Sequence, residues 1–227
     1  MTTYGQYCPV AQALEIVGDR WTLLIVRDML TGTAHFNDLI RGLPGLSRPL
    51  LAKRLRQLED AGLVEKRVTN GGRSTTSYHL TAAGQALNGV IGALLVWGSQ
   101  WAFGDPRPED LDPLLLMWWV RNGVYADRLP ARRVTAQFAF TGAEHAVYWL
   151  VLAREDVTLC LTDPGHPLDL LVTADLAAFF KLWVGRLDYA DALDGGAVQV
   201  DGIPRLVRAF PQWFTFSPAA PAVRAAR

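Results

Sequence analysis

Residues 47–80 read SRPLLAKRLRQLEDAGLVEKRVTNGGRSTTSYHL, and this is the most informative stretch of the chain. Its first part carries leucines at i, i+4 and i+7, a spacing that places them on one face of a helix: Leu51, Leu55 and Leu58. Ser47 before them is a favourable N-cap, and Gly62 after them is a favourable C-cap. The spacing therefore predicts a helix over residues 47–61 with one apolar face and one basic face.

A β-hairpin is predicted directly after this helix. Residues 63–68 have the composition of a strand, Asn70-Gly71-Gly72 that of a tight turn, and residues 74–80 that of a return strand. A basic helix can enter the major groove of a duplex, and basic side chains on a hairpin can reach a neighbouring groove or the phosphates. The stretch thus favours double-stranded DNA as a partner.

The composition of the chain fits one large domain or two ordinary ones, with 227 residues of which 50% are hydrophobic. The net charge of zero hides an asymmetry: ten Lys and Arg against seven Asp and Glu up to Gly104, then twelve against fifteen. Two cysteines imply no disulfide framework, and the sequence has neither a leader pattern nor an apolar run of about 18 residues. We therefore expect a cytoplasmic protein with no membrane partner.

Helices are also predicted on both sides of residues 47–80. Residues 10–17, 21–30 and 36–41 have helical patterns, and residues 81–103 are expected to form one long helix with Thr81 as its N-cap. The apolar side chains of the long helix cover too much of its circumference for packing on one side. A second copy of the chain, related by a two-fold axis, is the simplest partner, so we expect a homodimer.

The second half of the chain changes to a mixture of strands and helices. Strands are predicted at residues 134–140, 146–152, 157–162, 168–173 and 197–200, and helices at 114–120, 175–184, 187–193 and 203–210. This order predicts an α+β fold in which a small antiparallel sheet has its helices packed on one side. The last residues, 218–227, are rich in Ala and Pro and are expected to form a flexible tail.

An ordered series of motifs runs through the first half: Cys8-Pro9-Val10, Gly18-Asp19-Arg20-Trp21-Thr22-Leu23-Leu24-Ile25, Phe36-Asn37-Asp38-Leu39, Leu46-Ser47, LAKRLRQLEDAGLV at residues 51–64, and Tyr78-His79-Leu80-Thr81. This series resembles the HxlR family of bacterial winged-helix transcription regulators over about residues 8–101. The resemblance implies a dimer with a recognition helix at residues 47–61 and a wing at residues 66–78. The chain departs from the family at the wing, where members often carry prolines and this sequence has Asn70-Gly71-Gly72.

Three segments of the second half form another pattern: Val172-Thr173-Ala174-Asp175-Leu176, LDYADALDGG at residues 187–196, and Val198-Gln199-Val200-Asp201-Gly202. They resemble the end of a sterol-carrier-protein-like domain, over about residues 112–216. Members of that fold enclose an apolar cavity for hydrophobic molecules, although the fold also occurs without a known ligand. The expected organisation is a winged-helix domain at residues 1–104, a linker at 105–110, a sterol-carrier-like domain at 111–217 and the tail.

Cations on the predicted helix and hairpin are the candidates for contact with DNA. They are Arg48, Lys53, Arg54 and Arg56 on the helix, with Lys66, Arg67 and Arg73 on the hairpin. Contacts to phosphates give salt-dependent affinity without sequence information. Base reading is expected from the N-terminal half of the helix: Ser47, Arg48, Pro49 and Lys53. The alternative for all these charges is a plain solvated face.

Two further sites are candidates. Cys8 stands where some HxlR-like regulators sense oxidants or electrophiles, which requires an exposed thiol of lowered pKa; an inert, packed thiol is the alternative. Aromatic residues of the second half line a ligand cavity or simply form the core: Trp118, Phe138, Phe140, Trp149, Phe179 and Trp183. The sequence has no metal-binding pattern, cofactor motif or catalytic constellation, so we expect no metal, no cofactor and no enzymatic activity.

These features predict a dimeric DNA-binding transcription regulator of the repressor type. Its second domain would bind a small hydrophobic effector or only stabilise the dimer. Two alternatives stay open: a lipid carrier whose first half only dimerises, and a regulator that senses thiol oxidation through Cys8.

Overall fold

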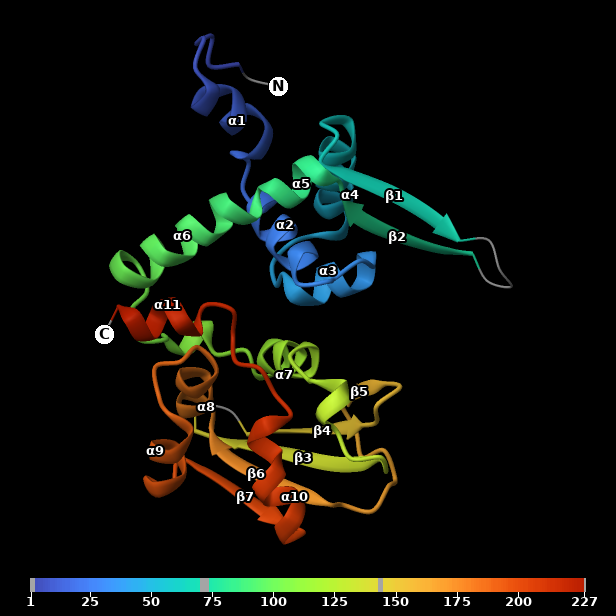
Figure 1. Ribbon diagram of the computed structural model, residues 1–227, viewed down its shortest axis with the longest axis vertical. Coiled ribbons are helices and arrows are strands. Elements are labelled where there is room, and N and C mark those ends of the chain that lie inside the picture. The colour runs from blue at the N-terminus through green and yellow to red at the C-terminus, as the bar shows by residue number, and fades with distance from the viewer. Residues whose placement is uncertain (1–2, 70–73, 143–144, 227) are drawn as a thin grey trace. The chain divides into compact units, whose positions relative to one another are not determined.

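A computed structural model describes residues 3–69, 74–142 and 145–226, and the chain divides into two compact units (Figure 1). The first unit comprises Met1–Leu94 and the second Leu95–Arg227. The division falls inside helix α6 (Asn88–Trp101), ahead of residues 105–110, where the sequence predicts the linker.

The first unit is built from helices followed by a two-stranded sheet. Its elements are α1 (Pro9–Val17), α2 (Thr22–Leu30), α3 (Phe36–Gly42), α4 (Arg48–Asp60), β1 (Val64–Thr69), β2 (Thr75–Leu80), α5 (Ala82–Ala86) and the beginning of α6. The core joins one face of α4 to α2 and α3, with Leu51, Ile25 and Leu39 each fully buried. The helices and strands predicted up to residue 80 are present, with ends that differ by at most one residue.

The long helix predicted over residues 81–103 is divided in two. The hydroxyl of Thr81 accepts a hydrogen bond from the Gly84 N–H at 3.2 Å and so caps α5, as expected. A turn at Leu87 then separates α5 from α6. The division occurs in a segment with Gly84, Asn88 and Gly89, three residues that stabilise a helix poorly.

The second unit is a five-stranded sheet with helices against one face. Its strands are β3 (Val134–Thr141), β4 (Ala146–Leu152), β5 (Val157–Cys160), β6 (Leu170–Asp175) and β7 (Val198–Gly202). Its helices are α7 (Pro113–Asn122), α8 (Leu176–Trp183), α9 (Tyr189–Asp194), α10 (Pro204–Ala209) and α11 (Ala220–Ala225), with short 3-10 turns at Pro108–Asp110, Ala126–Arg128 and Phe210–Gln212. The side chains of Phe138, Leu150 and Val172 point to the same face and join α7, α8 and α10 in one core.

The prediction of a purely antiparallel sheet is wrong. The strand order is β5-β4-β3-β6-β7, and β6 runs parallel to β3, with Ala136 opposite Leu170. The reason is that β5 is short and ends at Cys160. Cys160 pairs with Trp149 on β4, and Trp149 in turn pairs with Gln137 on β3. The chain then crosses to the other side of β3 through residues 161–169, and β6 starts from the same end of the sheet as β3.

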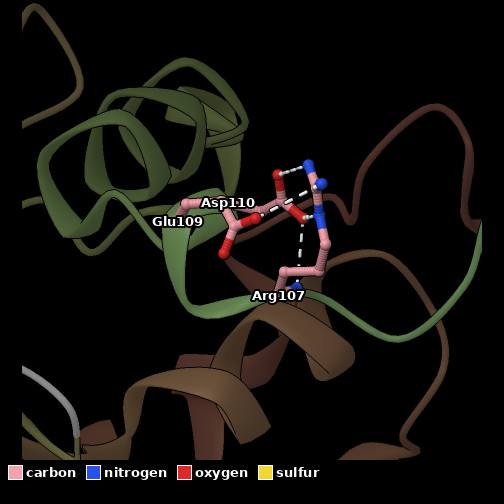
Figure 2. Close-up of polar contacts among 3 residues, drawn as sticks. All are labelled: Arg107, Glu109 and Asp110. Carbon is pink, nitrogen blue, oxygen red and sulfur yellow. Dashed lines mark hydrogen bonds and ion pairs between the residues drawn. The ribbon is translucent and has the colours of Figure 1, made fainter.

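The segment predicted as a linker is folded. The guanidinium of Arg107 donates to both carboxylate oxygens of Asp110 at 3.0 Å and lies 3.3 Å from Glu109, as Figure 2 shows. The hydrogen bond from the Arg107 side chain, followed by that from its backbone N–H, lowers the pKa of Asp110. Just before this turn, Asp105 pairs with Lys181 at 3.5 Å and Arg186 at 3.1 Å, so this segment is tied to the end of α8.

The expectation of a flexible tail is corrected as well. Residues Ala220–Ala225 form α11, in which Ala220 and Val223 are buried. Ala220 lies so close to Gly185 that a Cβ on that glycine would be 2.8 Å from the Ala220 methyl. An Ala-rich segment has a high helix propensity, and here the small side chains permit a close contact that a composition rule does not anticipate.

Candidate nucleic-acid interface

Helix α4 presents an apolar face to the core and a basic face to solvent. Ser47 caps it, because its hydroxyl accepts a hydrogen bond from the Leu50 N–H at 3.4 Å. The three leucines of the inner face are at most 1% exposed. On the other side, four side chains of the predicted DNA-contact set are exposed: Arg48, Pro49, Lys53 and Arg56. The sequence therefore identified both faces of this helix.

Arg54 departs from the prediction of a DNA-contacting cation. Its side chain is only 12% exposed, forms an ion pair with Asp19 and donates to the Gln57 side chain at 2.7 Å. Its Nε is buried without a hydrogen-bond partner among the described residues. Position 54 falls between the inner and outer faces of α4, and the Asp19 carboxylate in the turn between α1 and α2 draws the guanidinium toward the protein. Arg54 thus connects α4 to that turn rather than presenting a free charge.

Arg48 remains exposed but is held in place by α3. Its Nη2 donates to Oδ1 of Asn37 at 3.0 Å, and its Cζ lies 4.9 Å from the centre of the Phe36 ring. An arginine over an aromatic face is attracted by the electron-rich ring. The sequence analysis missed Asn37 as part of this site, although Phe36-Asn37 belongs to the motif series that carries the HxlR resemblance.

Lys53 and Arg56 differ from Arg54 because neither makes a hydrogen bond or ion pair with any residue in the described part of the chain. Arg56 lies near Tyr78 and Glu59: burial and the Glu59 charge raise the pKa of Tyr78, and the Arg56 charge opposes them. The Tyr78 hydroxyl therefore stays protonated at neutral pH and does not neutralise the charge of Arg56.

The hairpin after α4 extends the basic surface. Strands β1 and β2 pair antiparallel from Val64 opposite Leu80 to Thr69 opposite Thr75. Lys66 and Arg67 are exposed on β1, and Arg67 forms an ion pair with Glu65, which offsets part of its charge. The predicted turn at Asn70-Gly71-Gly72 and the candidate Arg73 lie outside the described residues.

Cys8 directly precedes α1 and is half-buried, and its carbonyl accepts a hydrogen bond from the Gln12 N–H at 3.0 Å. Cys160, the other cysteine, is half-buried at the end of β5. Within residues 3–69, 74–142 and 145–226, no group of three or more His, Cys, Asp and Glu side chains is arranged to hold a metal ion. In the same residues, no helix combines the length and the apolar character that crossing a membrane requires.

An apolar cavity of about 50 Å³ lies in the second unit, between the sheet and the helices. Three of the six aromatic candidates line it: Phe138, Phe179 and Trp183. The other three do not line this cavity: Trp118, Phe140 and Trp149. The walls also include residues that the sequence did not single out, among them Tyr189 and Phe210. Pockets for drug-sized ligands hold roughly 300–1,000 Å³, so a ligand would have to move these walls apart.

Helices α3 and α4, joined by a short turn and followed by the β1–β2 hairpin, are the arrangement of a winged helix-turn-helix protein. A family model described as HxlR-like helix-turn-helix matches residues 16–105. The transcriptional regulator YodB of Bacillus subtilis is 32% identical over 94 residues, which are 41% of this chain and 84% of that relative. The chain belongs to the HxlR-like helix-turn-helix family.

Two further comparisons describe the extent of the similarity. A helix-turn-helix transcriptional regulator of Mycobacterium tuberculosis is 42% identical over 100 residues, which are 44% of this chain. The chain spans 61% of the length of that relative. The solved structure of the reduced form of YodB aligns with 43% of this chain and 96% of its own, at 31% identity and a TM-score of 0.39.

These relatives are named as transcriptional regulators, in agreement with the expectation that the chain is not an enzyme. The family model ends at residue 105. The sterol-carrier-like character of the second unit is therefore still a prediction.

Proposed function

We propose that this chain is a dimeric DNA-binding transcription regulator that inserts α4 into the major groove of a two-fold symmetric operator. The observation that carries the proposal is the exposed basic face of α4, where Lys53 and Arg56 form no hydrogen bond or ion pair with the described residues. Cations that are unpaired in the free protein can neutralise phosphates without first breaking an ion pair. Base reading would come from the exposed N-terminal end of the helix, at Ser47, Arg48, Pro49 and Lys53.

The homodimer is supported by apolar side chains that the single chain leaves exposed. Helix α6 has no buried residue, and one stripe at i, i+4, i+7 and i+11 is 46–69% exposed: Val90, Leu94, Trp97 and Trp101. Val10 and Leu14 form a second exposed apolar pair on α1. A contiguous apolar surface of this kind is typical of a subunit interface. We propose that these stripes meet their copies across a two-fold axis, which would set the half-sites about one helical turn apart.

The second unit is proposed to be a sterol-carrier-like domain that binds a small hydrophobic effector. The apolar cavity walled by Phe138, Phe179 and Trp183 supports this role. An effector would change DNA binding only if it bound one spacing of the two recognition helices better than another. Stabilisation of the dimer without a ligand is the simpler role for the same domain.

Thiol sensing through Cys8 is a second candidate. Cys8 is not fully buried, and it stands at the beginning of α1, the helix that also carries the exposed pair Val10 and Leu14. The relative YodB has been solved in a reduced form and in a quinone-bound form, which associates redox chemistry with that protein. Oxidation of a thiol beside a subunit contact would be one way to alter the dimer.

The test of the main proposal begins with selection of duplexes from a randomised library by the purified protein. Binding of the selected duplex should weaken in Lys53→Ala and Arg56→Ala, because each variant removes a free cation. Arg208→Ala removes an exposed arginine of α10, outside the first unit, and should bind as the wild type does.

If both α4 variants bound as tightly as the wild type, the assignment of α4 would be wrong. If the protein selected no duplex and instead carried lipid detectable by mass spectrometry after purification, the carrier alternative would replace the regulator.

A further inference from the structure

The guanidinium of Arg48 is oriented by two neighbours on α3. Asn37 accepts a hydrogen bond from its Nη2 at 3.0 Å, and the Phe36 ring lies 4.9 Å from its Cζ. One contact holds an N–H of the guanidinium, and the other places its central carbon over an aromatic ring. Arginine has five N–H donors in a rigid fork, so most of them remain for a ligand.

The neighbour that orients Arg48 is neutral, and this distinguishes Arg48 from Arg54 and Arg67. Arg54 is paired with Asp19 and Arg67 with Glu65, so a carboxylate offsets each of their charges. Within the described residues, Arg48 has no carboxylate partner, because an amide oxygen takes that place. Asn37 therefore orders the side chain without cancelling the charge that attracts DNA.

The position of Arg48 suits a reader of bases. It is the first residue of α4, directly after the cap Ser47, and its side chain is exposed. In helix-turn-helix proteins the N-terminal residues of the recognition helix contact base edges. An arginine that is already ordered loses less conformational freedom on binding, and a fixed planar fork matches the two acceptors of guanine, O6 and N7.

We infer that Asn37 and Phe36 are positioning residues that make Arg48 the guanine-reading residue of the operator contact, whereas Arg56 contacts phosphate. The inference rests on the proposed DNA-binding function. It assigns specificity to an asparagine outside the recognition helix.

The test compares wild type, Asn37→Ala, Arg48→Ala and the double variant on the duplex that the wild type selects from a randomised library, and on all its single-base variants. The wild type should prefer guanine at one position of each half-site by about 5- to 150-fold over other bases. Asn37→Ala should reduce that preference several-fold at this position only and leave the salt dependence of binding unchanged, since no phosphate contact is lost. In the Arg48→Ala background, Asn37→Ala should have no further effect.

Two controls separate orientation from folding. Asn122→Ala removes a similar Asn–Arg hydrogen bond, of 3.0 Å to Arg121 on α7, and should not change base preference. If Asn37→Ala does not fold, Phe36→Leu takes its place as the test variant, because it keeps an apolar side chain against the core but removes the ring. Phe36→Leu should reduce the same guanine preference.

The inference is overturned if Asn37→Ala weakens binding to all duplexes equally, or if its effect persists in full without Arg48. The inference is also overturned if the wild type selects a duplex but shows no guanine preference that depends on Arg48. That result would leave the proposed function standing. If the wild type selects no duplex at all, both fall.

Discussion

Arg54 and Arg56 lie two residues apart on α4 and carry the same charge, yet their replacement by alanine should have different consequences. Arg56 is exposed and makes no hydrogen bond or ion pair in the described part of the chain. Arg54 is 12% exposed and bonded to Asp19 and Gln57. We therefore expect Arg56→Ala to change DNA binding and Arg54→Ala to change stability.

The expected magnitudes follow from these contacts. Each cation that neutralises a phosphate adds about 0.9 to the slope of log affinity against log salt, so Arg56→Ala should lower that slope by about 0.9 per bound copy of the chain. Hydrogen bonds to charged groups contribute about 1.5–3 kcal/mol, and surface ion pairs about 0–1 kcal/mol. Because Asp19 is 56% exposed, the loss for Arg54→Ala should fall between these two ranges, at about 1–1.5 kcal/mol.

Urea unfolding followed by circular dichroism gives the stability, and fluorescence anisotropy with a labelled selected duplex at several salt concentrations gives the slope. The stability of Arg56→Ala should equal that of the wild type, and the salt slope of Arg54→Ala should equal that of the wild type. Arg54→Ala with full stability and a slope lowered as much as in Arg56→Ala would show that Arg54 contacts phosphate, and the reasoning from its ion pair would be refuted.

Three other predictions concern the interface, the second unit and pH. Leu94→Glu on the exposed stripe of α6 should convert the dimer to a monomer in sedimentation velocity, because it places a charge in an apolar contact. The control Gln100→Glu should remain a dimer. If Leu94→Glu were still a dimer, the interface would lie elsewhere on the chain. Phe138→Ala, at a fully buried position on the cavity wall, should lower the free energy of unfolding by about 3–5 kcal/mol. Leu161 is 60% exposed, so the control Leu161→Ala should lower it by no more than about 0.5 kcal/mol. Equal effects of the two variants would contradict the buried position of Phe138. Burial raises the pKa of Asp169, but hydrogen bonds from the Arg132 side chain and the Thr135 N–H, together with the charges of Arg132 and Arg205, outweigh it and lower the pKa. The stability that Asp169 contributes should thus be complete above the ordinary carboxyl pKa of about 3.9 and disappear as the pH falls through the lowered value. Asp169→Asn should therefore be less stable than the wild type at neutral pH, and this difference should shrink in acid. Asp201→Asn is the control, and a stability difference that does not depend on pH would contradict the prediction.

The parts of the structure that the sequence predicts are those decided by local patterns. The leucine spacing of α4 and the cap at Ser47 depend on neighbours a few residues away. The strands of the second half also appear where apolar and β-branched residues concentrate, and Asp175 caps α8 by accepting from the Ala178 N–H at 2.8 Å.

The features that the sequence did not predict depend on contacts between distant residues. The direction of β6 follows from where β5 ends on β4. The inward position of Arg54 depends on Asp19, 35 residues earlier, and α11 depends on close contact with Gly185. The hydrogen bond between Arg48 and Asn37 joins residues that lie 11 apart in the chain and on different helices. Helical spacing alone placed Arg48 and Arg54 in one set of candidate DNA-contacting cations. Their different partners, Asn37 for Arg48 and Asp19 for Arg54, show that the two side chains are not equivalent.

The position of α4 in the major groove is tested most directly by dimethyl sulfate footprinting on the selected duplex, because the reagent methylates guanine at N7 in the major groove and adenine at N3 in the minor groove. With the wild type bound, guanine N7 should be protected in two half-sites about one helical turn apart, and Arg48→Ala should lose that protection. Full methylation of guanine N7 in a saturated complex, or protection at adenine N3 alone, would contradict major-groove insertion of this helix.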